Sequence, residues 1–357
     1  MINFINNLNN SIMFNLSLSA KELFHSNLLG FLFKEDEDLF GKIVGNTSIK
    51  VKSVEREHKN IDIEVTDQNG DKYLIENKVK DIIDCSQLDK IENSTKDKKT
   101  NAPNYKDYIL FSLLENNLSL LEKKYDDPGR DICWKEFGYK HIVDILKSHD
   151  FKDNTINIVK NDYCAFMDIM ISEFLNDYSR FDKYLLFWDK SDPNNLLEKY
   201  KKVRMHDVIQ KYGVSHFVGE FRKKCANPEI FSTYGFNRNG SMDFCIKRRC
   251  RHGSSNVDVD VGIQIENGKY RKSIIGETIH ETFLKSTFEA IGWFDKSWTS
   301  SHGKLYLGYD HRDGTQRWYQ VPDNVKNINY NDLYDKIKAD IDNVSKELNS
   351  RGWTPQP

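Results

Sequence analysis

Two carboxylates and one lysine, Asp62, Glu76 and Lys78, are the residues of this sequence whose types and spacing could do chemistry together. Two carboxylates offer the oxygen ligands that Mg²⁺ prefers, and bound Mg²⁺ keeps several waters and bridges to substrate phosphates. A neighbouring lysine can orient an attacking water and stabilise negative charge at a phosphorus centre. If the fold brings the three side chains together, they are suited to metal-assisted hydrolysis of a phosphodiester bond.

The local sequence predicts a hairpin that brings them together. Residues 61–67 alternate apolar and polar side chains, and residues 73–79 have the composition of a second strand. The loop Gln68-Asn69-Gly70 between them suits a type I turn followed by a glycine in the left-handed conformation, and this register places Asp62 opposite Glu76. The lysine follows Glu76 by two positions, so both side chains project from the same face of the strand.

The elements around this hairpin follow from periodicity and capping signals. Ser19 followed by Glu22 fits a capping box, and apolar residues at helical spacing predict a helix over 20–34. The sequence further predicts a strand over 50–57, the start of a helix at 86–92, a strand over 108–113, and helices over 140–148 and 156–178. This order of helix, antiparallel hairpin, helix and strand indicates an α/β domain over residues 1–180.

The second half of the chain has a different pattern. A polar stretch at 191–195 is a candidate linker, and a helix is expected over 195–212. Short strands separated by Asn-Gly and Asp-Gly turns follow at 231–236, 242–247, 257–266, 304–309 and 317–321. Asn331 suits the N-cap of a final amphipathic helix that ends near Leu348. We therefore expect a second, α+β domain, rich in β-structure, over residues 195–357.

Charge and hydropathy limit the partners. The 357 residues contain 52 lysines and arginines against 54 aspartates and glutamates, so any nucleic-acid surface must be local. The densest positive run holds Lys247, Arg248, Arg249 and Arg251, which are candidate phosphate contacts, with a solvated face as the alternative. Apolar runs fall far short of the roughly 20 residues that span a bilayer. Six cysteines at irregular spacing indicate reduced thiols, so we expect a cytoplasmic protein with no membrane partner.

The chemistry-bearing residues form part of a longer pattern that resembles a known family. The matching segments are Glu22-Leu23-Phe24-His25-Ser26, Ile61-Asp62-Ile63, Ile75-Glu76-Asn77-Lys78, Ser86-Gln87-Leu88 and Cys133-Trp134-Lys135-Glu136-Phe137-Gly138-Tyr139. They are similar to the PD-(D/E)XK nuclease superfamily, in its bacterial and phage members with an E-x-x-H-S first helix. The likeness covers roughly residues 20–175. It implies a restriction-endonuclease-like core, an α/β fold with a mixed central sheet flanked by helices.

The resemblance also implies residue roles and a cofactor. It implies that Asp62 and Glu76 bind the metal, that Lys78 is the catalytic lysine, that Gln87 lies at the catalytic face, and that Glu22 assists the metal site. The implied cofactor is Mg²⁺, with Mn²⁺ as a substitute. Two positions depart from the family pattern: Ile61 replaces the name-giving proline, and Asn60 stands where the group often has an arginine, so one expected cation is missing.

Two functions from different classes stay open. The first is a Mg²⁺-dependent nuclease that cuts DNA in phage defence, restriction or repair, with the second domain guiding the substrate or a partner. The alternative is a catalytically inactive nuclease-fold module that binds DNA or a partner protein. A homodimer or a defence-system partner is compatible with both. Glu22 itself has a competing explanation, because a capping-box glutamate needs no catalytic duty.

Overall fold

The protein is described by a computed structural model. It covers residues 11–58, 61–79, 83, 85–97, 100, 102–113, 118–121, 123–178, 201, 217, 221, 223–224, 231–236, 242–254, 257–266, 269–294, 305–308, 315–320 and 330–355, some of them by their backbone alone. Residues 11–178 belong to one compact unit and residues 217–355 to another. The predicted boundary between 180 and 195 lies outside the described residues and stays a prediction. Among the helices that are described, none has the length and hydropathy needed to cross a membrane.

The first unit is built on a five-stranded mixed sheet. Across the sheet the order is β1 (Val51–His58), β2 (Ile61–Asp67), β3 (Lys72–Lys78), β4 (Asp107–Ser112) and β5 (Trp134–Gly138). The first three strands are antiparallel neighbours, whereas β3, β4 and β5 run parallel. β3 is therefore the central strand, and every residue of it after Lys72 is buried. β5 was not among the predicted strands, because its five residues include only two large apolar side chains.

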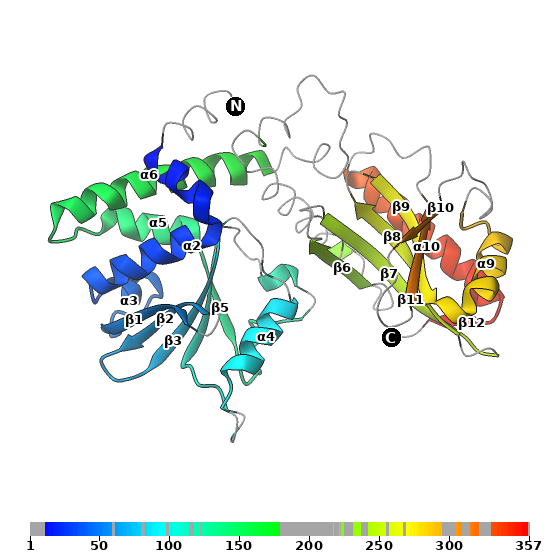
Figure 1. Ribbon diagram of the computed structural model, residues 1–357, viewed down its shortest axis with the longest axis horizontal. Helices are drawn as coiled ribbons and strands as arrows, with labels where there is room; N and C mark the ends of the chain where they lie inside the picture. Colours follow the sequence, from blue (N-terminus) through cyan, green and yellow to red (C-terminus); the bar gives the residue numbers. More distant parts are fainter. Residues whose placement is uncertain are drawn as a thin grey trace. The chain divides into compact units, whose positions relative to one another are not determined.

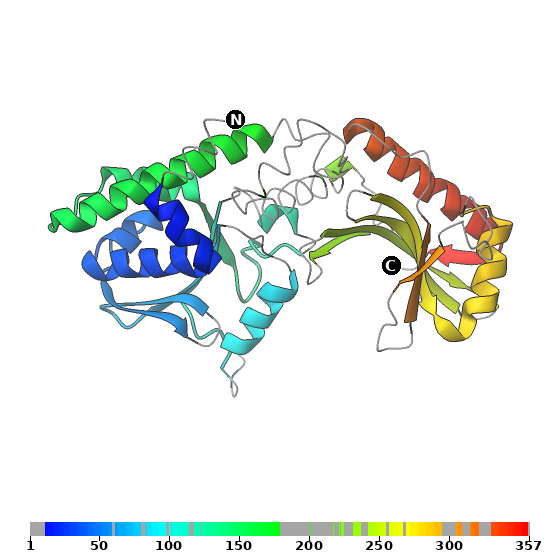
Figure 2. The same cartoon turned by 45° about the horizontal axis from the view of Figure 1, so that its top comes forward.

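Helices cover both faces of this sheet. α2 (Ile12–Glu35), α3 (Leu39–Ile43) and α5 (Tyr139–Ser148) lie on one face, and α6 (Asn154–Tyr178) packs on α2 and α5. α4 (Cys85–Thr95) lies on the other face, and a short 3₁₀ helix, η1 (Leu118–Leu120), precedes β5. Figures 1 and 2 show α2, α5 and α6 on one side of the sheet and α4 on the opposite side. We call these two sides the α2 face and the α4 face. The arrangement is the predicted mixed sheet flanked by helices.

The hairpin of β2 and β3 has the predicted register. Ile63 pairs with Ile75, and extending this ladder by one residue places Asp62 opposite Glu76. Because side chains alternate along a strand, the apolar residues of β2 are directed to the α2 face and Asp62 to the α4 face. The alternation in β3 directs Glu76 to the same α4 face. The period-2 pattern of the sequence therefore separates the core from the polar cluster.

The turn of this hairpin also forms as predicted. Gly70 has a φ of 86°, the left-handed conformation that glycine adopts without steric cost. The side chain of Asp67 accepts hydrogen bonds from the backbone N–H groups of Asn69 and Asp71, both at 2.9 Å. This local bonding fixes the loop length, and the loop length fixes which residues of the two strands face each other.

The first helix is longer than predicted, and its start corrects the capping interpretation. Ser11 is the N-cap of α2, and its hydroxyl accepts the N–H of Phe14 at 3.2 Å. Ser19 and Glu22 are therefore interior residues of the helix, and the predicted capping box is wrong. The earlier start is held by tertiary packing, because Phe14 is fully buried against Phe166 of α6.

The second unit is an antiparallel sheet packed against helices. The order is β10 (Leu305–Gly308), β11 (Thr315–Gln320), β9 (Lys269–Glu277), β8 (Val257–Glu266), β7 (Met242–His252) and β12 (Trp353–Pro355), and β6 (Phe231–Phe236) also pairs with β7. A 3₁₀ helix, η2 (Thr278–His280), leads into α9 (Glu281–Ala290), and α10 (Tyr330–Ser350) follows β11 in the described chain. Val259 and Val261 of β8 share a core with Ile337 and Ile341 of α10. This is the predicted α+β, β-rich second domain.

Several boundaries in this unit differ from prediction. β6 and β8 have the predicted bounds, but β7 continues to His252 through the basic run. α10 includes Asn331 in its first turn, so the N-cap prediction for that residue is wrong. β9 and α9 were not predicted, because the charged start of β9 masks its alternation. The predicted linker and the Asn-Gly and Asp-Gly turns of this unit lie outside the described residues. So does the helix predicted over 195–212, except for Lys201, which is helical.

Candidate active site

Asp62, Glu76, Lys78 and Gln87 meet at one end of β3 on the α4 face. Lys78 forms an ion pair with Glu76, with Nζ 2.8 Å from Oε1, and the two residues are only 8 % and 2 % exposed. The amide of Gln87, in the first turn of α4, donates to the same Oε1 at 2.5 Å. Asp62 joins them through the backbone, because the N–H of Asn77 donates to Asp62 Oδ2 at 2.8 Å. The structure thus brings together four of the five predicted catalytic residues.

Burial shapes the electrostatics of Asp62. Desolvation raises the pKa of this carboxyl above its usual range, although the Asn77 N–H and the charge of Lys78 act in the opposite direction. Asp62 Oδ2 is occupied by that N–H, and among the described groups no hydrogen bond reaches the other oxygen, Oδ1. A partly desolvated carboxylate with one oxygen left open is a good ligand for a cation, because a bound cation would offset the cost of burying the charge.

Asn77 ties this end of β3 to the helices on the opposite face. It is fully buried. Its side-chain Nδ2 donates to Ser26 Oγ at 3.1 Å, and its side-chain Oδ1 accepts from the hydroxyl of Tyr139 at 2.7 Å. Ser26 belongs to α2 and Tyr139 to α5. His25, the neighbour of Ser26, is also buried, with Nδ1 3.0 Å from the hydroxyl of Tyr163. The His-Ser pair of the E-x-x-H-S pattern therefore holds the fold behind the acids.

The first turn of α4, which carries Gln87, is fixed by Tyr125. Its hydroxyl lies 2.7 Å from Asp89 Oδ1 and 3.0 Å from the backbone carbonyl oxygen of Cys85, both on α4. Asp89 is paired with Lys123 as well, and this pairing lowers the pKa of the Asp89 carboxyl despite its partial burial. Two side chains from the segment before β5 thus hold the start of the helix.

The second half of α4 is fixed by Glu92. Its carboxylate receives Arg130 Nη2 on both oxygens, at 3.0 and 2.9 Å, and the indole N–H of Trp134 at 3.0 Å. Arg130 also lies over the ring of Tyr125, 4.5 Å from its centroid. Trp134 is the tryptophan of the stretch that suggested the family. Its role here is to anchor α4, and so Gln87, against β5.

Glu57 of β1 lies beside the acid pair. The ladder of β1 and β2 pairs Arg56 with Ile63, so the next position, Glu57, faces Asp62. Burial and the charge of Asp62 raise the pKa of Glu57. Glu57 has a φ of 54°, a left-handed conformation that costs a residue with a side chain about 1–3 kcal/mol. From the sequence alone Glu57 could either reach the metal site or pair with Arg56 or Lys59, and the pairing was the favoured alternative. Strand register instead places it opposite Asp62.

Glu22, the fifth predicted residue, is placed only by its backbone. It lies one turn before Ser26 in α2, and its side chain is outside the described residues. The loss of the capping box removes the competing structural explanation for Glu22. Its metal-assisting role stays a prediction.

Asp62 and Glu76 are the described side chains that could hold a metal ion. No group of three or more His, Cys, Asp or Glu side chains is arranged as a metal cage in the part of the chain that is described. Two carboxylates suit Mg²⁺, which retains waters and is usually bound by one or two carboxylates plus substrate phosphates. The residues present therefore fit the expected ion.

The predicted phosphate contacts on β7 lie in the second unit. Arg251 forms a two-pronged ion pair with Asp258 of β8, at 2.7 and 2.8 Å. The strand register also places Arg249 opposite Asp260. The side chains of Lys247, Arg248 and Arg249 are outside the described residues. The positive charge of Arg251 is already paired with the carboxylate of Asp258, so its role in binding phosphate stays a prediction.

A comparison with known families finds a match within the first unit. Residues 34–165 match the family model of the PD-(D/E)XK nuclease superfamily. The matched segment contains Asp62, Glu76, Lys78 and Gln87 and begins after Glu22. No curated protein and no solved structure matches the chain. The match confirms the resemblance on which the sequence predictions for this unit rest.

Proposed function

We propose, from the match of residues 34–165 to the PD-(D/E)XK nuclease superfamily, that the chain is a Mg²⁺-dependent nuclease that hydrolyses phosphodiester bonds of DNA. The observation that carries the proposal is the bonded cluster of Asp62, Glu76, Lys78 and Gln87 at the end of β3. An acid pair, a lysine and a polar helix residue in one cluster provide the groups that phosphodiester hydrolysis needs.

Each side chain has a defined task in this proposal. Asp62 and Glu76 would hold Mg²⁺, which when bound supplies Lewis-acid stabilisation of phosphoryl oxygens and a more acidic water. Lys78 places its ammonium beside the site, where it orients the attacking water and stabilises the negative charge that develops on phosphorus. Gln87 and Lys78 both donate to Glu76 Oε1, so they fix the direction of that carboxylate. The Asn77 N–H does the same for Asp62.

DNA as substrate, and phage defence, restriction or repair as the setting, come from the resemblance and belong to the proposal. The competing function is a nuclease-fold module that binds DNA or a partner protein without cutting. The complete cluster favours the enzyme, because a lysine buried against a carboxylate is expensive to desolvate, and an inactive module could be as stable with apolar residues of similar volume in place of the pair.

Plasmid cleavage by the purified chain tests the proposal. We expect cleavage with Mg²⁺ or Mn²⁺, none with a chelator, and a rate lowered by about 10²-fold or more for Asp62→Asn. Asp168→Asn is the matched control, since Asp168 is a half-exposed acid of α6, on the other side of the sheet, that pairs with Lys147. Metal-independent DNA binding without cleavage by the parental chain would support the inactive module instead.

A further inference from the structure

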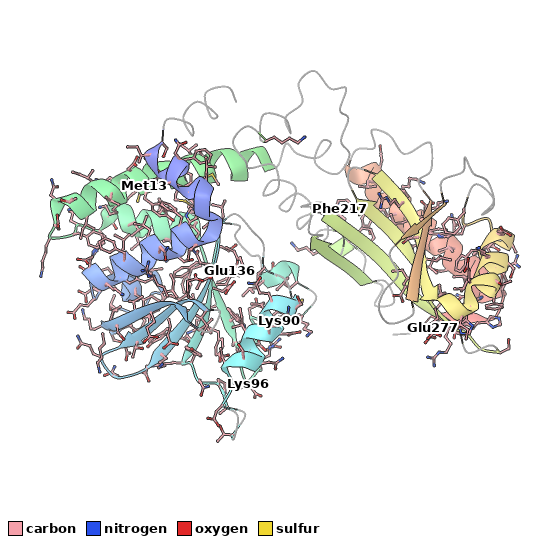
Figure 3. The ribbon with its side chains drawn as sticks, viewed as in Figure 1. Met13, Lys90, Lys96, Glu136, Phe217 and Glu277 are labelled. Carbon is pink, nitrogen blue, oxygen red and sulfur yellow. The ribbon has the colours of Figure 1, made fainter. Side chains whose placement is uncertain are left out.

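The outer surface of α4 differs in charge from the rest of the α4 face. Its exposed residues Ser86, Lys90, Asn93 and Ser94, which we call the α4 outer surface, include one charged side chain, and it is positive. A second lysine, Lys96, follows directly after the helix and is partly exposed. Figure 3 labels Lys90 along α4 and Lys96 beyond its end.

The acids of α4 do not counter these lysines. Asp89 is bonded to Lys123 and Tyr125, and Glu92 is bonded to Arg130 and to the indole of Trp134. No ion pair of Lys90 or Lys96 occurs among the described residues. Both ammonium groups are therefore available to an anion that approaches this surface.

The neighbouring strands on the same face of the sheet have the opposite sign. Glu55 and Glu57 are exposed residues of β1, and the register places them opposite Glu64 and Asp62 of β2. Glu64 is neutralised by Lys72 at 2.6 Å, but no comparable ion pair of Glu57 occurs in the described chain. A polyanion that leaves the acid pair over β1 and β2 meets carboxylates, whereas one that leaves over α4 meets ammonium, hydroxyl and amide groups.

The helix starts at the site, so its outer surface leads away from it. Gln87 contacts Glu76 in the first turn. At about 1.5 Å per residue, Lys90 lies about 4.5 Å and Lys96 about 13 Å further along the helix axis. At about 3.4 Å of rise per nucleotide in one strand, this distance corresponds to about four nucleotides.

We propose that the α4 outer surface with Lys96 binds the phosphodiester backbone of the nucleic acid next to the bond that is cut. This inference rests on the proposed function and adds the path that the substrate takes. Lys90 and Lys96 neutralise backbone phosphates, and the side-chain amide of Asn93 donates a hydrogen bond to a phosphate oxygen. The contacts are to the backbone, so they position the substrate without reading its sequence.

The salt dependence of binding tests this path. The Lys90→Ala/Lys96→Ala variant of the full chain is titrated with a labelled DNA duplex at several salt concentrations. Two lost phosphate contacts should lower the slope of log Kd against log salt concentration by about 2. The matched control is Lys140→Ala/Lys152→Ala, which removes the same charge from exposed positions in and after α5 and should keep the parental slope.

Cleavage measurements separate the possible failures. We expect the Lys90/Lys96 variant to need more DNA for half-maximal rate while its rate at saturation and its Mn²⁺-induced thermal shift stay parental. A slope equal to that of the control variant overturns the α4 path, even if the parental chain cuts DNA. A parental chain that neither binds nor cuts DNA overturns the proposed function, and the inference with it.

Discussion

The ion pair between Lys78 and Glu76 allows a prediction that compares two variants. The variant that loses more stability without metal, Lys78→Met, should keep its metal binding, and the variant that loses less, Glu76→Gln, should lose it. The side chains are 10 % and 3 % exposed and 2.8 Å apart, so removing either charge leaves the other buried without its partner. Breaking such a pair typically costs about 3–5 kcal/mol. Without metal, Glu76→Gln should lose an amount of stability near the lower end of this range. Lys78 still interacts with Asp62 in this variant, and the glutamine oxygen can still accept hydrogen bonds. Lys78→Met should lose an amount of stability near the upper end of the range, because two nearby carboxylates then lack their cation.

Added metal should reverse the order of stability of these two variants. At a Mn²⁺ concentration of about 100 times its Kd, binding stabilises the parental fold by about 2.7 kcal/mol. For a unit of this size that is a rise in Tm of about 5–10 °C. Lys78→Met should show an equal or larger rise, because the ion replaces the missing ammonium beside Asp62 and Glu76. Glu76→Gln should show almost none, because one carboxylate is left to bind the ion.

Thermal unfolding with and without Mn²⁺, combined with plasmid cleavage, measures all of these quantities. We expect no cleavage by Glu76→Gln and a rate about 10²-fold lower for Lys78→Met. The matched control is Lys72→Met, which breaks the ion pair with Glu64 on the same strands. It should keep the parental metal response. Equal metal responses of Lys78→Met and Glu76→Gln, or parental cleavage by Lys78→Met, would refute the reasoning.

Two further predictions concern the surroundings of the site. Tyr139→Phe should lower the free energy of unfolding by about 1–3 kcal/mol, because the buried side-chain oxygen of Asn77 loses its donor. It should also weaken Mn²⁺ binding, because the backbone N–H of Asn77 holds Asp62. An unchanged free energy in urea unfolding and an unchanged Mn²⁺ affinity in calorimetry would contradict this. His149 is buried beside Asp36 and Lys42, and burial lowers its pKa below the usual value near 6.5, so the folded state favours the neutral ring. Its contribution to stability is present above pH 6.5 and is lost as the pH falls through the folded pKa. His149→Gln should therefore cost less stability at pH 5.5 than at pH 7.5, and an equal cost at both values would exclude this linkage.

Local interactions explain why the hairpin could be predicted in detail. The loop of β2 and β3 is defined by Gly70 and by the bonds of Asp67 to the loop backbone, all within a few residues. Once the loop length is known, the pairing of Asp62 with Glu76 follows from counting. The face shared by Glu76 and Lys78 follows from the period of a strand. These features depend on neighbours in sequence, so the sequence contains them.

The ends of helices were less predictable, because packing decides them. Ser19 and Glu22 fit a capping box, yet α2 starts at Ser11, because Phe14 is buried against Phe166 of another helix. Phe166, which lies far along the chain, thus stabilises the first turns of α2, whose helical conformation the local sequence does not determine. In the second unit, the pairing of Arg251 with an acid of the next strand likewise arises from strand register.

The sequence by itself determined the acid pair, the lysine, their shared face and the family that residues 34–165 match, because turn chemistry and strand period act over short stretches of chain. Only the tertiary structure decided that Gln87 donates to Glu76, that Asn77 joins β3 to two helices, and that Glu57 faces Asp62. These contacts join residues from separate elements of the fold. Their geometry depends on how helices pack on a sheet and how strands align, which no single stretch of sequence specifies.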